Sequence, residues 1–335
     1  MEINDDGTIL GVLLFIKNII PFLLFFLGCT ILYYSSESFI DKSIIISQKL
    51  KISPIIIGAS VIAIGTSLPE LLVSLYSVFV HSYQTDTGML ASSGIVVGNI
   101  LGSNIANVAL VLGFCSLLYK VIFESNVLKD LLFISFLGLY VIGCIYFDVT
   151  INYVHGICLL VSFIFYFYYL ILNNQSDDSF ANDNTISLIY IFLVIIIAII
   201  GLSIGTNLIV ENALQIANLL GISELNIGFS IVALGTSLPE LFTALSSIKR
   251  KNYNLLIGNI IGSNIINIIF VLGMASVFTS INVNSSLITN ENLVAVVFIV
   301  SHLILVLSYL INKSVSRFSG FLLLITYIFF MYNLF

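Results

Sequence analysis

Gly65-Thr66-Ser67-Leu68-Pro69-Glu70 reads GTSLPE, and the same six residues return at positions 235–240. Both copies lie inside long apolar runs, where a membrane-spanning helix would normally carry Leu or Ile. Ionisable side chains inside membrane spans are rare because they are costly to bury, and they usually mark a functional site. Two identical copies, 170 residues apart, therefore predict a site built around Glu70 and Glu240.

The composition places the whole chain in a membrane. Of its 335 residues, 59% are hydrophobic and only 8% are charged, whereas soluble domains carry about 25% charged residues. The net charge of −6 comes mainly from the termini and loops, and it gives no sign of a nucleic-acid partner. We therefore expect an all-α, multi-pass protein that is embedded in the lipid bilayer.

Apolar runs of about 20 residues each span a bilayer once as helices. The sequence contains ten such runs, at approximately 9–34, 54–80, 93–118, 128–147, 153–172, 186–210, 225–248, 256–278, 292–311 and 318–334. The first and sixth are followed by amphipathic extensions, residues 37–51 and 211–224, which we expect at the membrane interface. Proline removes a helical N–H donor and clashes with the preceding turn, so the second and seventh helices should be interrupted at GTSLPE.

The positions of Lys and Arg predict the orientation. With the N-terminus outside, ten of the eleven basic residues fall in cytoplasmic loops, and Lys17 is the exception. Cytoplasmic loops carry an excess of Lys and Arg, so we expect both termini outside, in a plasma or inner membrane. The acidic segment 174–185 contains no Lys or Arg, and we expect it to be a cytoplasmic linker.

The two halves of the chain are internal repeats. Residues 57–77 align with 227–247 without a gap, and residues 98–113 match 258–273 at 11 of 16 positions. We assign residues 1–173 to the first repeat and 186–335 to the second, with five spans in each. An odd number of spans inverts the second repeat relative to the first. Inverted repeats with interrupted helices are typical of secondary transporters, whose site lies near the midplane of the bilayer.

The second repeated block supplies further polar side chains. Ser103 and Asn107 are four residues apart, hence on one helix face, and Ser263 and Asn267 repeat the arrangement. One interpretation is that these side chains face the glutamates as ligands. The alternative is that they join neighbouring helices by hydrogen bonds.

The proline breaks are expected to free the backbone carbonyls of Ala63 and Ala233 from their helical donors. The Ser-x-x-Glu spacing also fits a capping box at a helix start, which is the alternative role for Ser67 and Glu70. Carboxylates, amides, hydroxyls and carbonyls are all hard oxygen donors, and such donors suit Na⁺, Ca²⁺ or Mg²⁺. The same carboxylates cannot hold two kinds of ion at once, so competition at one site combined with alternating access would give antiport.

Together, the two blocks GTSLPE and GSNIxN resemble the repeats of the calcium/cation antiporter superfamily, specifically sodium/calcium exchangers of the prokaryotic type. The resemblance covers nearly the whole chain. It implies ten transmembrane helices arranged as two inverted five-helix repeats, and exchange of Na⁺ for Ca²⁺ without a resident cofactor. It also implies a 3:1 stoichiometry and a gate formed by the first and sixth helices, which slide across the rest.

The resemblance further implies individual roles. Glu70 and Glu240 would be central ligands that bridge the Ca²⁺ and Na⁺ sites, together with the side chains of Thr66, Ser67, Thr236 and Ser237 and the carbonyls of Ala63 and Ala233. Ser103 and Ser263 would line flanking Na⁺ sites, and Asn107 would be a ligand from the third helix. Many members carry Asp where this chain has Asn267, so the stoichiometry, K⁺ co-dependence and proton sensitivity stay open.

Two other functions remain open at this point. The first is a cation/proton exchanger of the same superfamily, and the second is a passive cation channel, which would conduct without a counter-ion. A membrane-bound enzyme is disfavoured, because the sequence shows no nucleophile–base pair or HExxH motif and its loops are short. The sequence does not predict the oligomeric state.

Overall fold

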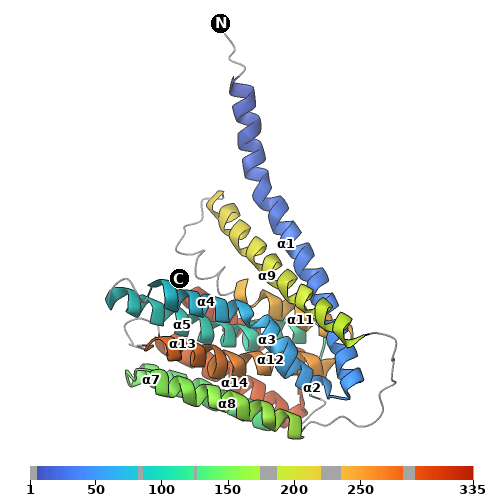
Figure 1. The fold of residues 1–335 in the computed structure, drawn as a ribbon, viewed down its shortest axis with the longest axis vertical. Coiled ribbons are helices and arrows are strands. Elements are labelled where there is room, and N and C mark those ends of the chain that lie inside the picture. Colours follow the sequence, from blue (N-terminus) through green and yellow to red (C-terminus); the bar gives the residue numbers. More distant parts are fainter. Residues whose placement is uncertain are drawn as a thin grey trace.

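The computed structural model describes residues 6–81, 86–123, 127–173, 187–219, 235–281 and 291–334. This part of the chain is almost entirely helical (Figure 1). Its only named strands are β1 (Val121–Ile122) and β2 (Ser314–Val315), which pair antiparallel. The expected all-α class is therefore confirmed.

The helices of the first half and of the second half follow the same order. The first half contains α1 (Asp6–Leu50), α2 (Pro54–Ile57), η1 (Gly58–Ile62), α3 (Ala63–Thr66), α4 (Leu68–His81), α5 (Asp86–Ile105), η2 (Ala106–Leu112), α6 (Gly113–Leu118), α7 (Leu128–Tyr146) and α8 (Tyr153–Asn173). The second half contains α9 (Leu188–Leu219), α11 (Leu238–Lys249), α12 (Tyr253–Ile266), η3 (Asn267–Leu272), α13 (Gly273–Phe278), α14 (Glu291–Asn312) and α15 (Arg317–Leu334). The η segments are π-helical turns within longer helices.

The described helices account for a multi-pass membrane protein. Seven of them are long and apolar enough to cross a bilayer, and the bent pair Pro54–Thr66 and Leu68–Phe79 makes an eighth. Helix α15 is apolar but shorter, and α11 follows residues 220–234, which lie outside the described ranges. The count of ten spans therefore stays a prediction.

The first GTSLPE copy breaks its helix as expected. The two segments on either side of Ser67 meet at an angle of 42°, and Ser67 has φ −84° and ψ 7°. In the second copy, Ser237 has nearly the same angles, φ −89° and ψ 2°, and α11 begins at the next residue. Ala233 and the helix before it lie outside the described part of the chain.

Helices α1 and α9 are continuous and pack side by side (Figure 1), and they contain 45 and 32 residues. The extensions after the first and sixth spans therefore continue the same helices, and their place at the membrane interface stays a prediction. Phe39, Ile40 and Ile46, from the extension of α1, are buried against α9 and α2 in one apolar cluster. Ser43 and Ser47 are buried on the same stretch, so the extension stays in protein contact almost to its end.

The centre of the molecule is formed by the two long composite helices α5–η2–α6 and α12–η3–α13. The window of Tyr253–Phe278 is 94% buried, so protein surrounds it on all sides. Helices α7, α8, α14 and α15 pack outside these two. Polar groups on the central helices are therefore held away from lipid.

A close crossing fixes η1 against α12. A methyl group on Gly58 would come within 2.6 Å of the Leu255 carbonyl oxygen, and one on Gly258 would overlap the Ile55 carbonyl oxygen. Both obstacles are backbone atoms, which cannot rotate away as a side chain can. Only glycine at these two positions permits this approach.

We expect Gly258→Ala to destabilise the protein by about 1–3 kcal/mol, the usual cost of overpacking. The measurement is the thermal unfolding midpoint of the purified protein in detergent. Gly143→Ala is the matched control, because nothing lies within 4 Å of a Cβ built there and alanine favours the helix. Equal midpoints for the two variants would contradict the crossing.

Candidate cation-binding site

The two GTSLPE copies bring their glutamates together in the protein interior. Glu70 lies in the first turn of α4 and Glu240 in the first turn of α11, because each half-helix restarts just after its Ser. Both side chains are 0% exposed. The carboxylates lie close enough for the charge of Glu70 to repel that of Glu240.

Eight buried oxygen atoms in this region have no hydrogen-bond partner among the described residues. They are both carboxylate oxygens of Glu70 and of Glu240, the hydroxyls of Ser67 and Ser237, and the amide oxygens of Asn107 and Asn267. Buried polar atoms are nearly always hydrogen-bonded, so such a cluster needs an explanation. A hard cation bound among the eight oxygens would satisfy them.

The capping-box alternative fails in this geometry. The Ser67 and Ser237 hydroxyls and the glutamate oxygens make no hydrogen bond in the described part of the chain. At the start of α11, the Ser237 side chain accepts no bond from the helix. These side chains are therefore not occupied in closing the helix ends.

Hydroxyl groups from both repeats flank the carboxylates in a two-fold pattern. Thr66 and Ser263 share a hydrogen bond of 3.2 Å, and Ser103 and Thr236 share one of 3.3 Å. The Thr66–Ser263 pair lies beside Glu240, whereas the Ser103–Thr236 pair lies beside Glu70. Each carboxylate is thus flanked by one hydroxyl from each repeat.

Four asparagines form a cross-linked network between α5–η2 and α12–η3. Asn104 and Asn264 each donate from the side chain to the other's backbone carbonyl, at 3.1 Å in both directions. Asn107 Nδ2 donates to Asn264 Oδ1 at 2.9 Å, and Asn267 Nδ2 donates to Asn104 Oδ1 at 3.1 Å. Each amide nitrogen thus donates one hydrogen bond within the network, and the Oδ1 atoms of Asn107 and Asn267 have no hydrogen-bond partner among the described residues. The π-helical turns η2 and η3 begin at this level, and π-turns are frequent at functional sites.

The asparagines of the second block thus join the two central helices by hydrogen bonds, and their role as ligands stays a prediction. Asn104 and Asn264 join the helices, while Asn107 and Asn267 join them through nitrogen and keep an oxygen free.

Sequence reasoning missed two supporting residues, Asn99 and Asn259. Asn259 Oδ1 accepts from Thr66 at 3.2 Å and from Ser263 at 3.3 Å, so it orients the hydroxyls next to Glu240. Asn99 Nδ2 donates to the Glu70 backbone carbonyl at 3.0 Å. The signal was present, because the Gly-Asn dipeptide opens the repeated block in both halves.

The expectation for the Ala63 carbonyl needs a correction. This oxygen accepts the Ser67 N–H at 3.0 Å and also the Thr66 hydroxyl at 3.4 Å, so it is not freed by the break. The reason is that proline removes the donor to the residue four positions earlier, which is Gly65 and not Ala63. A role for the Ala63 carbonyl as a ligand stays a prediction, and Ala233 lies outside the described residues.

The fold and the site together define a class of protein: a helical, multi-pass membrane protein with an internal, two-fold-related set of buried oxygen atoms. Comparison with known proteins identifies the family within this class. The family model described as "Sodium/calcium exchanger protein" matches residues 20–172 and 190–335. The chain belongs to this sodium/calcium exchanger family.

Relatives match over nearly the full length. An uncharacterised membrane protein of Methanocaldococcus jannaschii is 37% identical over 309 residues, which cover 91% of this chain and 94% of the relative. The sodium/calcium exchanger MaX1 of Methanosarcina acetivorans is 28% identical, with 94% and 99% covered. A solved structure of the sodium–calcium exchanger NCX_Mj, soaked with Na⁺ and Ca²⁺, superimposes with a TM-score of 0.77 at 34% identity, over 93% of this chain and 97% of that one.

We expect Ca²⁺ to raise the thermal stability of the purified protein, by about 2.7 kcal/mol at one hundred times its dissociation constant. Glu240→Gln should abolish the response, because Gln removes a negative ligand. The same variant should be more stable than the parent without ions, since it relieves the repulsion from Glu70. The measurement is the unfolding midpoint with and without CaCl₂, with choline chloride at equal ionic strength as the control. A Ca²⁺ response retained in Glu240→Gln would remove this residue from the site.

Proposed function

We propose that the chain exchanges Na⁺ for Ca²⁺ by alternating access at the site around Glu70 and Glu240. The observation that carries the proposal is the set of eight buried oxygens that have no hydrogen-bond partner among the described residues. Two ionised carboxylates give the site a charge of −2, which one Ca²⁺ or two Na⁺ neutralise. Since the same oxygens serve both loads, the ions compete. Membership of the sodium/calcium exchanger family supports these substrates.

The individual roles follow the geometry. Glu70 and Glu240 are shared ligands, with Ser67, Ser237, Asn107 and Asn267 completing the central set through their free oxygens. The hydroxyls of Thr66, Thr236, Ser103 and Ser263 lie to either side and line the flanking Na⁺ positions. The carbonyls of Ala63 and Ala233 contribute from the breaks. K⁺ stays a possible third ion.

The proposed architecture has ten spans in two inverted repeats, residues 1–173 and 186–335, joined by a cytoplasmic linker at 174–185. Both termini lie outside, in a plasma or inner membrane. The two-fold pattern of hydroxyl and asparagine contacts supports the inverted relation. The match to NCX_Mj over 97% of that chain supports the common layout.

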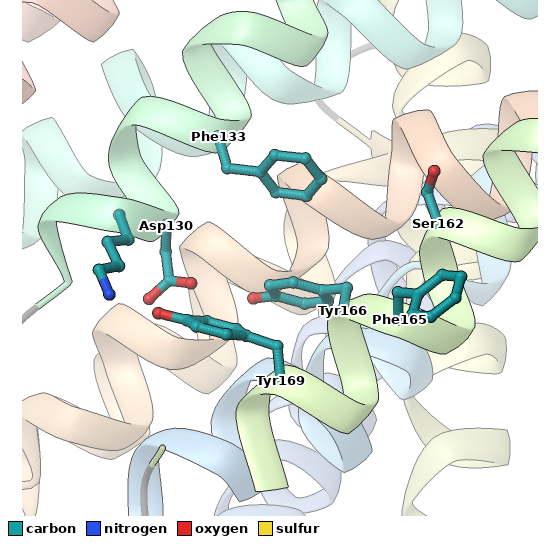
Figure 2. A pocket seen from close by; sticks show the side chains of 7 residues that line it. Asp130, Phe133, Ser162, Phe165, Tyr166 and Tyr169 are labelled. Carbon is teal, nitrogen blue, oxygen red and sulfur yellow. The ribbon is translucent and has the colours of Figure 1, made fainter. Parts of the chain in front are cut away.

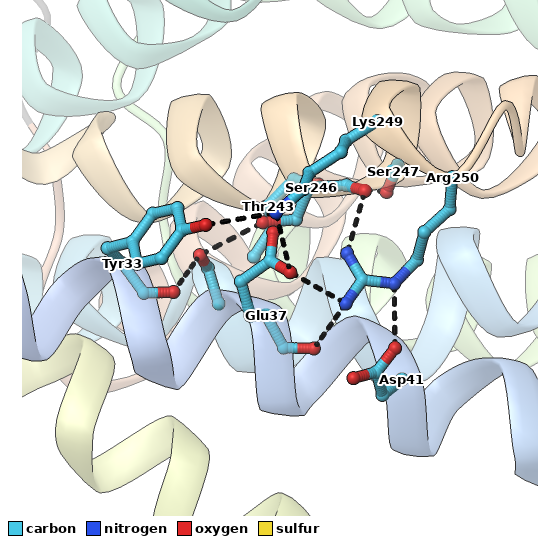
Figure 3. A network of polar contacts seen from close by, with 9 residues as sticks. Tyr33, Glu37, Asp41, Thr243, Ser246, Ser247, Lys249 and Arg250 are labelled. Carbon is cyan, nitrogen blue, oxygen red and sulfur yellow. Dashed lines mark hydrogen bonds and ion pairs between the residues drawn. The ribbon is translucent and has the colours of Figure 1, made fainter.

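Alternating access requires a part that moves, and we assign this role to the paired helices α1 and α9. A polar network joins α1 to the end of α11 (Figure 3). Arg250 forms ion pairs with Asp41 at 2.7 Å and with Glu37 at 2.8 Å. Lys249 contacts Glu37 at 3.3 Å and donates to the Tyr33 hydroxyl at 3.0 Å. These contacts hold the segment of α1 from Tyr33 to Asp41 against the end of α11.

Among the described residues, the other repeat has no equivalent of this network. At the repeat spacing of 170 residues, Glu37 of the first repeat corresponds to Asn207, and Lys249 of the second repeat corresponds to Phe79. Neither replacement can form the ion pair. The described parts of α9 and α4 also lack the packing that α1 makes on α11. By the positive-inside orientation the network lies on the cytoplasmic side, so it favours the state that is closed to the cytoplasm.

The function is tested by Ca²⁺ flux in proteoliposomes. Uptake of labelled Ca²⁺ should require an outward Na⁺ gradient, and Glu70→Gln and Glu240→Gln should each abolish it in folded protein. Uptake driven by a pH gradient without Na⁺ would instead establish the cation/proton exchanger, and conductance without a counter-ion would establish the channel. Transport retained in both variants would refute the site.

Arg250→Gln should raise the apparent affinity for Ca²⁺ at the cytoplasmic face, because it weakens the state closed to that side. A loss of about 1 kcal/mol, typical of partly exposed charge pairs, corresponds to a shift of about fivefold. The measurement is the half-saturating Ca²⁺ concentration in vesicles of known orientation. Lys251→Gln is the matched control, since it makes the same charge change one residue away and its side chain has no ion pair in the described region. An equal shift in both variants would indicate a general effect of surface charge.

A further inference from the structure

A cavity of about 360 Å³ lies between α7 and α8 and shares no residue with the cation site (Figure 2). Its lining consists of Lys129, Asp130, Phe133, Ser162, Phe165, Tyr166 and Tyr169. The lining is mainly aromatic, with one carboxylate and one ammonium group at one end. Such a mixture of apolar walls and a few polar groups is typical of sites for organic ligands.

Asp130 is the unusual member of this lining. It is only 7% exposed, and no described residue donates a hydrogen bond or forms an ion pair to its carboxylate. Figure 2 shows the carboxylate pointing toward the phenol oxygens of Tyr166 and Tyr169. An aspartate in the first turn of a helix interacts favourably with the helix dipole. An exposed aspartate at the same position would gain this interaction and also keep its hydration. The burial of Asp130 therefore requires another explanation.

The second repeat provides an internal comparison. Gly156 of α8 packs on the Gly273 carbonyl, and Gly320 of α15 packs on the Gly113 carbonyl, so these positions correspond at a spacing of 164 residues. The same spacing pairs the buried Ile134 of α7 with the buried Phe298 of α14.

At that spacing, Val294 replaces Asp130 and Phe330 replaces Tyr166, and both replacements are buried. Helices α14 and α15 also pack directly on each other, whereas the described backbones of α7 and α8 approach each other much less. The fold is thus built without the carboxylate, the phenol or the gap in one of its two copies. These features of the first repeat are available for binding.

We propose that the cavity binds the headgroup of an aminophospholipid, with its primary ammonium group at Asp130 and its phosphate at Lys129. An ammonium group offers three N–H donors and no acceptor, which matches a carboxylate without donors. Lys129 is exposed next to it and supplies the cation for a phosphate. The acyl chains would follow Phe165, which is 67% exposed on the outer face of α8 and so faces lipid in a membrane.

The arrangement of the rings favours a primary over a quaternary ammonium. Aromatic cages for quaternary groups need several ring faces that converge on one point. Here the rings of Phe133 and Tyr166 stack on each other, with centroids 5.9 Å apart and an interplanar angle of 25°, so their faces are partly used. Hydrogen bonding to Asp130 is left as the main source of selectivity.

The absence of tryptophan from the sequence makes a sharp test possible. Phe165→Trp places a single fluorophore at the cavity, and Phe329→Trp places one at the corresponding exposed position of the other repeat. Each full-length variant is reconstituted in vesicles that contain equal fractions of phosphatidylethanolamine and phosphatidylcholine, with the bromine quencher on the acyl chains of one lipid or the other. We expect brominated phosphatidylethanolamine to quench the F165W protein more strongly, and both lipids to quench the F329W protein equally.

Adding Asp130→Asn to F165W should lower the preference for phosphatidylethanolamine by about tenfold, the equivalent of one hydrogen bond to a charged group. Should this variant fail to fold, a series of N-methylated headgroups tests the unmodified Asp130, and quenching should weaken with each N–H removed. Soluble phosphoethanolamine should not relieve the quenching, since the acyl chains contribute to binding.

Equal quenching of F165W by the two lipids would overturn the proposal, and so would a preference that survives Asp130→Asn. A preference for phosphatidylcholine would overturn it in favour of an aromatic site for quaternary ammonium groups. Relief of quenching by soluble phosphoethanolamine would overturn the assignment to a lipid. None of these outcomes depends on which ions the protein exchanges.

Discussion

The structure depends on two carboxylates that are buried in the protein interior and make no hydrogen bond to any described residue. Glu70 and Glu240 are both 0% exposed, and none of their oxygens is hydrogen-bonded in the described part of the chain. Burying one unpaired carboxylate is costly, and a second like charge beside it adds repulsion. A bound cation would offset both the cost of burial and the repulsion, so the site would be most stable with a cation bound. Under the proposed function, this dependence links the stability of the fold to ion binding and transport.

Neighbouring elements keep the carboxylates in place against this repulsion. The breaks at Ser67 and Ser237 set each glutamate in the first turn of a new half-helix, and the crossing of Gly58 and Gly258 fixes η1 on α12. The asparagine network then locks the two central helices to each other. Each device occurs in two-fold related contacts, and the oxygens at the centre are therefore presented equally by both halves.

The sequence predicted the centre of this arrangement better than its surroundings. The repeated hexapeptide predicted the break at Ser67 and the interior position of both glutamates, since a proline and a carboxylate in an apolar run leave few alternatives. The helical spacing of Ser103 and Asn107 predicted a shared face. Contacts between helices that are distant in the sequence were not predicted, because helical spacing relates only residues of one helix. The ion pairs of Arg250 and the support from Asn259 are of this kind. The prediction that the break frees the Ala63 carbonyl was wrong, because Pro69 removes the helical donor to Gly65 and not to Ala63.

The two corresponding asparagines, Asn107 and Asn267, also affect the net charge that the proposed exchange would carry across the membrane. Asn267 Nδ2 donates to Asn104 Oδ1 at 3.1 Å. An ionised Asp at position 267 could not make this bond, so it would face the Asn104 oxygen as a second acceptor unless it carried a proton or Asn104 turned over. Asn267 completes the network without a proton, and the charge of the site is then set by the two glutamates alone. One Ca²⁺ would neutralise them, whereas three Na⁺ would leave one positive charge. Under the proposed exchange, the Na⁺-loaded form is therefore the one that responds to the membrane potential, by about 2.3 kcal/mol per 100 mV for one charge carried across the membrane.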